Sequence, residues 1–187
     1  MNNTYAGKDV SAELTSAFRK KGVLRLDQFL AGEDYLRFAQ QLWNLKGTLT
    51  HRPDQYSYIA LSSALAQQLF ASSTFKTFLS SVVGKKITRI AHSTQIFGWK
   101  NYTLVHDDHA GTERLAFFFC IAGTWDTSWG GTVTYLTGNG EGQSLLFPPQ
   151  GNCLCIVQQR KDMHSFIKYV NHRAGKERFI IIEGVFS

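Results

Sequence analysis

The apolar residues change their spacing near residue 87, and this change is the feature that most constrains the fold. Before it they recur at intervals of three and four, as at Tyr35, Phe38 and Leu42, which places them on one face of a helix. The spacing predicts a helix at about 33–45 and two more helical segments before residue 86, the second one opened by the capping stretch Ser72-Ser73-Thr74.

From Ile87 onward the apolar segments are short, rich in β-branched and aromatic residues, and separated by glycine. This pattern is typical of consecutive strands. The predicted strands lie at about 87–97, 102–108, 114–122, 132–136, 144–147, 152–158, 164–170 and 178–186. We therefore expect a mainly β fold, a double-stranded β-helix of the jelly-roll or cupin-like kind, with N-terminal helices packed on one sheet.

Length and composition fit one domain. The chain has 187 residues, of which 43% are hydrophobic, enough for a buried core. We expect a single domain over 1–187, with about 1–86 as helical support and 87–187 as the jelly-roll core. The net charge of +6 allows an acidic partner, but short basic clusters are usually solvated surface.

The cysteines and the hydropathy pattern suggest a cytoplasmic protein. Three cysteines, two of them in Cys153-x-Cys155, form no disulfide framework, and the pair lacks the second pair of a zinc site. We expect them to be buried strand thiols. The N-terminal residues do not resemble a signal peptide, and no run of 18 apolar residues occurs, so neither secretion nor a membrane span is expected.

One short segment combines metal-ligating side chains. Side chains alternate along a strand, so His106 and Asp108 share a face and Asp107 points away. Two histidines and one carboxylate form a facial triad that leaves iron(II) open positions. His164, at the start of a late strand, is the best candidate for the third ligand, and Asp107 and His109 rank second.

The order of several motifs resembles the prolyl-hydroxylase branch of the 2-oxoglutarate/iron(II) oxygenases over about residues 87–186. That branch has a His-x-Asp turn, an arginine before a hydrophobic strand, a tryptophan segment ending in Gly-Gly, a proline-flanked turn, a second histidine and a late arginine. The corresponding residues here are His106-Asp107-Asp108, Arg114, Trp125 to Gly131, Pro148-Pro149, His164 and Arg178.

The resemblance implies iron(II) bound by His106, Asp108 and His164, with 2-oxoglutarate and dioxygen as co-substrates and ascorbate as a stimulant. It further implies that Arg178 pairs with the distal carboxylate of 2-oxoglutarate, for which a planar guanidinium is suited. Arg173 and Lys176 are alternatives to Arg178. Tyr102 is a candidate hydroxyl donor to the same co-substrate, with a packing role equally open.

The resemblance favours hydroxylation of a prolyl or other amino-acid side chain in a protein or peptide. A free amino acid or natural-product intermediate is the alternative substrate, and loops at about 51–58, 109–113 and 137–143 are expected to select it. Nucleic-acid demethylation is disfavoured, because the second arginine usual in that group is replaced by Gly184. Two rivals of other classes are a non-catalytic cupin-like metal- or ligand-binding protein and a zinc hydrolase, for which only the outward Asp107 is available as a base.

Overall fold

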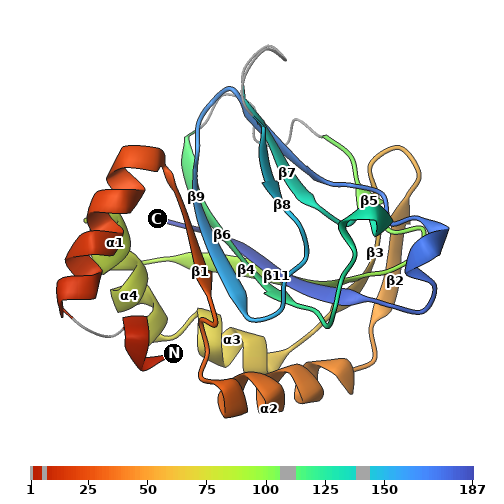
Figure 1. Cartoon of the computed structure of the whole chain (residues 1–187), viewed down its shortest axis with the longest axis horizontal. Helices are drawn as coiled ribbons and strands as arrows, with labels where there is room; N and C mark the ends of the chain where they lie inside the picture. The colour runs from red at the N-terminus through yellow and green to blue at the C-terminus, as the bar shows by residue number, and fades with distance from the viewer. Residues whose placement is uncertain (1, 6–7, 106–112, 138–143) are drawn as a thin grey trace.

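The computed structural model describes residues 2–5, 8–105, 113–137 and 144–187. Two β-sheets face each other, and the helices lie on the far side of the larger sheet (Figure 1). None of the helices in these ranges is long and apolar enough to cross a membrane.

The helices lie in the first half of the chain, as expected. The α-helices are α1 (Lys8–Lys21), α2 (Gly32–Trp43), α3 (Ala64–Phe70) and α4 (Ser73–Val83), with the 3-10 turns η1 (Asn3–Tyr5), η2 (Thr127–Trp129) and η3 (His172–Ala174). The Ser63 and Ser72 side chains cap α3 and α4 by accepting backbone N–H groups, which satisfies donors that have no partner within the helix. Gly84 ends α4 in the left-handed conformation with φ 72°, which glycine adopts without steric cost.

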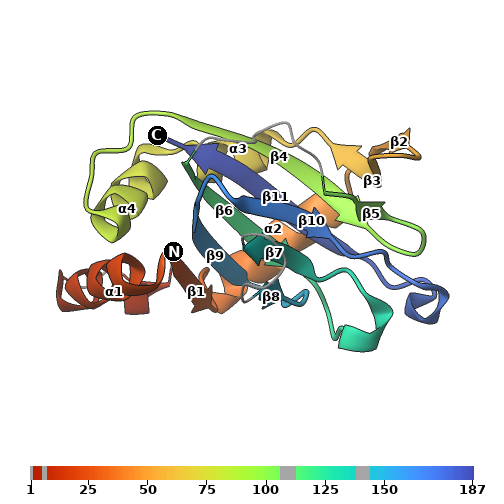
Figure 2. The ribbon, with the colours of Figure 1, turned by 90° about the horizontal axis from the view of Figure 1, so that it is seen from above.

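The large sheet has the order β1-β9-β6-β11-β4-β3-β2, and β5 pairs with β3. Its strands are β1 (Val23–Asp27), β2 (Thr48–Arg52), β3 (Tyr56–Leu61), β4 (Ile90–Phe97), β5 (Tyr102–Thr103), β6 (Arg114–Ile121), β9 (Cys153–Gln159) and β11 (Phe179–Phe186). The small sheet has the order β10-β7-β8, with β7 (Val133–Thr137), β8 (Leu145–Phe147) and β10 (Met163–Ile167). Figure 2 shows β7, β8 and β10 lying over the large sheet.

Each face of the large sheet buries its own core, because neighbouring residues on a strand point to opposite sides. On the outer face, Phe117 lies 5.5 Å from Phe70 and 5.2 Å from Phe75 between ring centroids. Burying one such ring contributes about 1.5–3 kcal/mol. On the inner face, Phe118 meets Phe147 of the small sheet at 5.3 Å. The helices thus hold the large sheet in place while the space between the two sheets is left for a site.

Two segments differ from the sequence-based expectation. Residues 48–61, partly expected as a loop, form the β2–β3 hairpin and extend the large sheet. The first part of the chain therefore supplies strands as well as helical support. Of the strand expected at 102–108, the structure assigns Tyr102–Thr103 to β5. Leu104 donates its backbone N–H to the Gln55 carbonyl at 2.7 Å, and residues 106–108 lie outside the described residues.

Candidate functional site

A cavity of about 330 Å³ opens between the two sheets. Seven strands each contribute one inward-facing residue to its polar lining: Ser93, Thr103, Arg114, Tyr135, Gln159, Ser165 and Glu183. Ala116, Phe118, Val133 and Ile167 supply apolar walls. Ser93 and Glu183 are exposed to solvent, so the cavity is open at this end of β4 and β11.

Arg114 is the only Lys or Arg residue, within the described residues, that lines this cavity. Its Nε donates a hydrogen bond to Gln159 Oε1 at 2.8 Å. The two residues are cross-strand partners on β6 and β9, which is why their side chains meet. Burial lowers the pKa of Arg114 below its usual value, while the nearby Tyr135 and Glu183 act in the opposite direction.

Two acidic groups complete the charge pattern of the cavity. Glu183 Oε1 accepts a hydrogen bond from Gln95 Nε2 at 2.8 Å. Tyr135 is 5% exposed, and burial together with the charge of Glu183 raises the pKa of its hydroxyl. The tyrosine is therefore a neutral hydrogen-bonding group at neutral pH. The cavity can hold a small polar molecule between one cation, one carboxylate and an uncharged hydroxyl.

Two of the three expected metal ligands, His106 and Asp108, lie outside the described residues, as do Asp107 and His109. The third, His164, is half-buried on β10 and pairs with Leu136 of β7. Its neighbour Ser165 pairs with Tyr135 and lines the cavity. Strand alternation therefore places His164 on the outer face of the small sheet.

Over residues 2–5, 8–105, 113–137 and 144–187, no group of three His, Cys, Asp or Glu side chains is placed to hold a metal ion. The described residues alone therefore do not form an iron site.

The structure places Arg178 and Tyr102 away from the cavity. Arg178 shares the helix-covered face of β11 with Ile180 and Ile182, as the alternation predicts, but that face is the outer one. Its guanidinium lies 5.9 Å from the Trp43 ring centroid, and it lines a surface depression together with Lys176. Arg178 does not line the cavity between the sheets.

Tyr102 donates its hydroxyl to the Pro53 carbonyl at 2.7 Å, and its ring lies 6.1 Å from that of Tyr169. This corresponds to the packing role. The alternative cation Arg173 is exposed on η3. Like Arg178 and Lys176, neither Tyr102 nor Arg173 lines the cavity.

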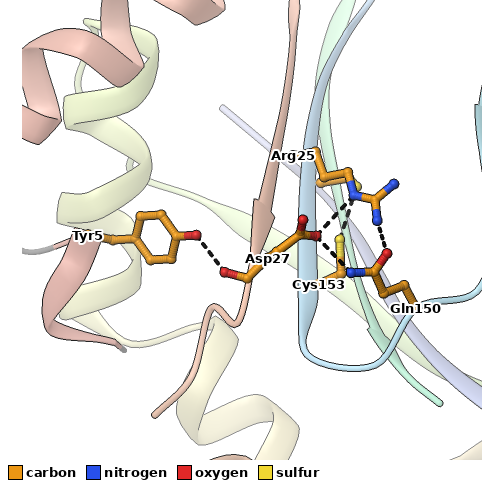
Figure 3. Close-up of polar contacts among 6 residues, drawn as sticks. Tyr5, Arg25, Asp27, Gln150 and Cys153 are labelled. Carbon is orange, nitrogen blue, oxygen red and sulfur yellow. Dashed lines mark hydrogen bonds and ion pairs between the residues drawn. The ribbon is translucent and has the colours of Figure 1, made fainter. Parts of the chain in front are cut away.

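The cysteines lie where buried strand thiols were expected. Cys153 and Cys155 share the inner face of β9, with 3.9 Å between their sulfur atoms, and Cys120 is the cross-strand partner of Cys153. Burial raises the pKa of Cys120 to about 12, so this thiol stays protonated and unreactive at neutral pH. A polar cluster at the β1 edge, in which Asp27 binds Arg25 and Gln150, lies beside Cys153 (Figure 3).

Sequence reasoning did not identify Gln159, Tyr135 and Glu183 as site residues. One signal was present for Glu183, because a single carboxylate interrupts the apolar strand that begins at Phe179. The motif order includes Arg114 but gives no role for its side chain.

The facing sheets and the strand order define a double-stranded β-helix, the class of fold expected from the sequence. Solved structures agree. A Pseudomonas putida prolyl-4-hydroxylase matches with a TM-score of 0.71 and 10% identity, covering 94% of this chain and 97% of that one. A prolyl hydroxylase from Trichoplax adhaerens, solved with a peptide of the hypoxia-inducible factor oxygen degradation domain, matches with a TM-score of 0.73 and 11% identity, covering 95% and 89%.

Residues 47–185 match the model of a protein family described as oxoglutarate and iron-dependent oxygenase degradation C-term. The chain belongs to the oxoglutarate- and iron-dependent oxygenase family, an enzyme family whose cofactors are iron(II) and 2-oxoglutarate.

Two relatives with similar sequences are prolyl 3-hydroxylases. The prolyl 3-hydroxylase OGFOD1 of Xenopus laevis is 20% identical over 219 residues, which is 93% of this chain and 43% of that protein. The prolyl 3-hydroxylase OGFOD1 of Mus musculus is 32% identical over 79 residues, which is 41% of this chain and 14% of that protein. The chain spans less than half the length of these relatives.

Proposed function

We propose that the protein is a 2-oxoglutarate- and iron(II)-dependent dioxygenase that hydroxylates a prolyl or other amino-acid side chain in a protein or peptide. The observation that carries the proposal is the polar cavity between the two sheets, at the end of the barrel that is open to solvent. Its volume of about 330 Å³ is at the lower end of the range of small-molecule sites. The overall reaction converts 2-oxoglutarate, dioxygen and a C–H bond into succinate, carbon dioxide and an alcohol.

The open end of the cavity favours a side chain carried on a polymer over a fully enclosed small molecule. Ala91, Ser93, Glu183 and Val185 line the cavity and are exposed, so a peptide backbone can lie across the opening while one side chain enters. A free amino acid or natural-product intermediate remains the alternative substrate.

The proposed iron ligands are His106, Asp108 and His164, which follow the motif order of the sequence. His106 and Asp108 come three and five residues after β5 ends at Thr103, and Thr103 lines the cavity. His164 directly precedes Ser165, another cavity residue. The strand register of β10 argues against His164 as an iron ligand, because it places this side chain on the outer face of the small sheet. Iron binding by His164 therefore has to be measured directly.

A substrate experiment tests the proposed class of reaction. The protein is incubated with iron(II), 2-oxoglutarate and dioxygen, together with a proline-containing peptide, the same peptide with alanine in place of proline, or free proline. The proposal predicts that the proline peptide gains the mass of one oxygen atom and that the alanine peptide does not. Oxidation of free proline alone would support the small-molecule alternative, and no oxidation of any amino-acid side chain would contradict the proposal.

A second candidate function, ligand binding without turnover, is favoured by the outer-face position of His164. In that case the cavity takes up a small polar molecule and no 2-oxoglutarate is consumed. The iron(II) affinity of a His164 variant distinguishes the two candidate functions, because only the dioxygenase requires His164 for metal binding.

A further inference from the structure

The Arg114 side chain is held in a fixed orientation at the open end of the cavity. Its Nε is bonded to Gln159 Oε1 at 2.8 Å, and Gln159 Nε2 donates to the Met163 carbonyl at 3.3 Å. Gln159 is itself 5% exposed. Both ends of the Gln159 amide are therefore bonded. Arg114 uses its Nε to bind Gln159, so its two terminal nitrogens remain available for another partner.

The charge of Arg114 has no close carboxylate partner among the described residues, where no Asp or Glu oxygen lies within 4.0 Å of it. Burial lowers the pKa of the guanidinium, but an arginine remains charged in proteins. Glu183 lines the same cavity and bonds Gln95. A partly desolvated guanidinium is stabilised by a bound carboxylate, which can accept two parallel hydrogen bonds.

The opposite end of the barrel, at the start of β11, has no room for such a ligand. Phe97 and Phe179 stack there with 5.5 Å between ring centroids and 15° between their planes, and both are 0% exposed. Arg178, next to Phe179, lies on the other face of the sheet near Trp43. A carboxylate between the sheets therefore has Arg114 within reach, whereas Arg178 is separated from it by packed rings.

We propose that Arg114, oriented by Gln159, binds a carboxylate group of 2-oxoglutarate in this protein, in place of Arg178. This inference rests on the proposed function. It assigns the co-substrate to the open end of the cavity and makes Gln159 a positioning residue that acts through Arg114.

The experiment measures the dissociation constant of 2-oxoglutarate by calorimetry on the iron(II)-loaded protein without dioxygen, so that no turnover occurs. Arg114→Gln, Arg114→Lys and the matched control Arg178→Gln are compared with the wild type. Arg114→Gln is expected to weaken binding by about ten- to hundredfold, as for the loss of a hydrogen bond to a charged group. Arg114→Lys is expected to lie in between, because an ammonium cannot bind both carboxylate oxygens in the same fork, and Arg178→Gln is expected to stay within about twofold.

Thermal unfolding of each variant shows whether it is folded, and Arg114→Lys carries the test if Arg114→Gln is not. Wild-type affinity in both Arg114 variants, or a loss in Arg178→Gln alone, would overturn the inference and leave the proposed function intact. An amidated proline peptide is titrated in parallel, and a loss confined to the peptide in the Arg114 variants would also overturn it. Failure of the wild type to bind 2-oxoglutarate would remove the proposed function itself.

Discussion

Arg114 and Arg178 are the same type of side chain in two different surroundings. Arg114 faces the space between the sheets and is bonded to Gln159, whereas Arg178 faces outward beside Trp43. Because side chains alternate along a strand, a shift of one position decides which face a residue occupies. The chemical role of each arginine therefore depends on strand register more than on residue type.

The role of His164 also depends on strand register, and replacing this residue tests that role. If His164 binds iron(II), as the proposed enzyme requires, His164→Ala lowers the iron(II) affinity by at least about tenfold, since even the loss of a residue that only supports a ligand costs about 10- to 100-fold. Equilibrium competition with a metal chelator measures this affinity. Ser165→Ala, at the neighbouring position, is the matched control and is expected to bind iron normally. Unchanged affinity in His164→Ala would favour binding without turnover.

Among the secondary-structure elements, strands β4 and β6 both lie close to β11 at Gly184. A Cβ at this position would lie 2.6 Å from the Ala91 carbonyl oxygen and 2.7 Å from the Phe117 ring. Glycine is therefore needed here for space between strands, which is one of the recognised reasons for glycine within a strand.

We predict that Gly184→Ala destabilises the protein by about 1–3 kcal/mol, the usual cost of overpacking. Denaturant unfolding followed by circular dichroism gives the change in the free energy of unfolding. Gly123→Ala is the control, because a Cβ there meets nothing within 4 Å, and it is expected to change stability by less than about 0.5 kcal/mol. Equal effects of the two substitutions would show that β4 and β11 are not packed as described.

The contact between β4 and α3 gives a pH-dependent prediction. The His92 ring lies 6.3 Å from the Phe70 ring, and burial lowers its pKa below the ordinary value of 6.5. Between the lowered pKa and ~6.5 the unfolded chain binds a proton that the folded chain does not, so stability falls as the pH drops through this interval.

His92→Phe removes this titration and keeps an aromatic ring against Phe70. The free energy of unfolding of the variant should therefore decrease less than that of the wild type between about pH 7.5 and about pH 5. A parallel decrease in His92→Phe and the wild type would contradict the assignment.

At the scale of the whole molecule, the sequence was sufficient for the class of fold. The spacing of apolar residues predicted α2 nearly to its ends, and it predicted the strands after residue 87 because each buries one apolar face. The β2–β3 hairpin was partly missed. Most of the residues of β2 are exposed, so this strand lacks the alternation of apolar and polar residues that marks a half-buried strand.

The site was less predictable than the fold. The motif order identified the family, but it did not show that the interior face of β11 carries Phe179, Ile181 and Glu183 while Arg178 points outward. Nor did it reveal that Arg114, Gln159 and Tyr135, which are distant in sequence, meet in one cavity. Such convergence follows from the pairing of sheets in space, which local spacing does not contain.

Succinate formation shows directly whether this protein consumes 2-oxoglutarate in an iron-dependent reaction. Succinate is quantified after incubation of the wild type and of the His106→Ala, Asp108→Ala double variant with 2-oxoglutarate, dioxygen and the proline peptide, with and without iron(II). Succinate is expected only from the wild type with iron(II), in an amount that matches the hydroxylated peptide. Succinate at the wild-type level from the double variant, or none from the iron-loaded wild type, would contradict this expectation.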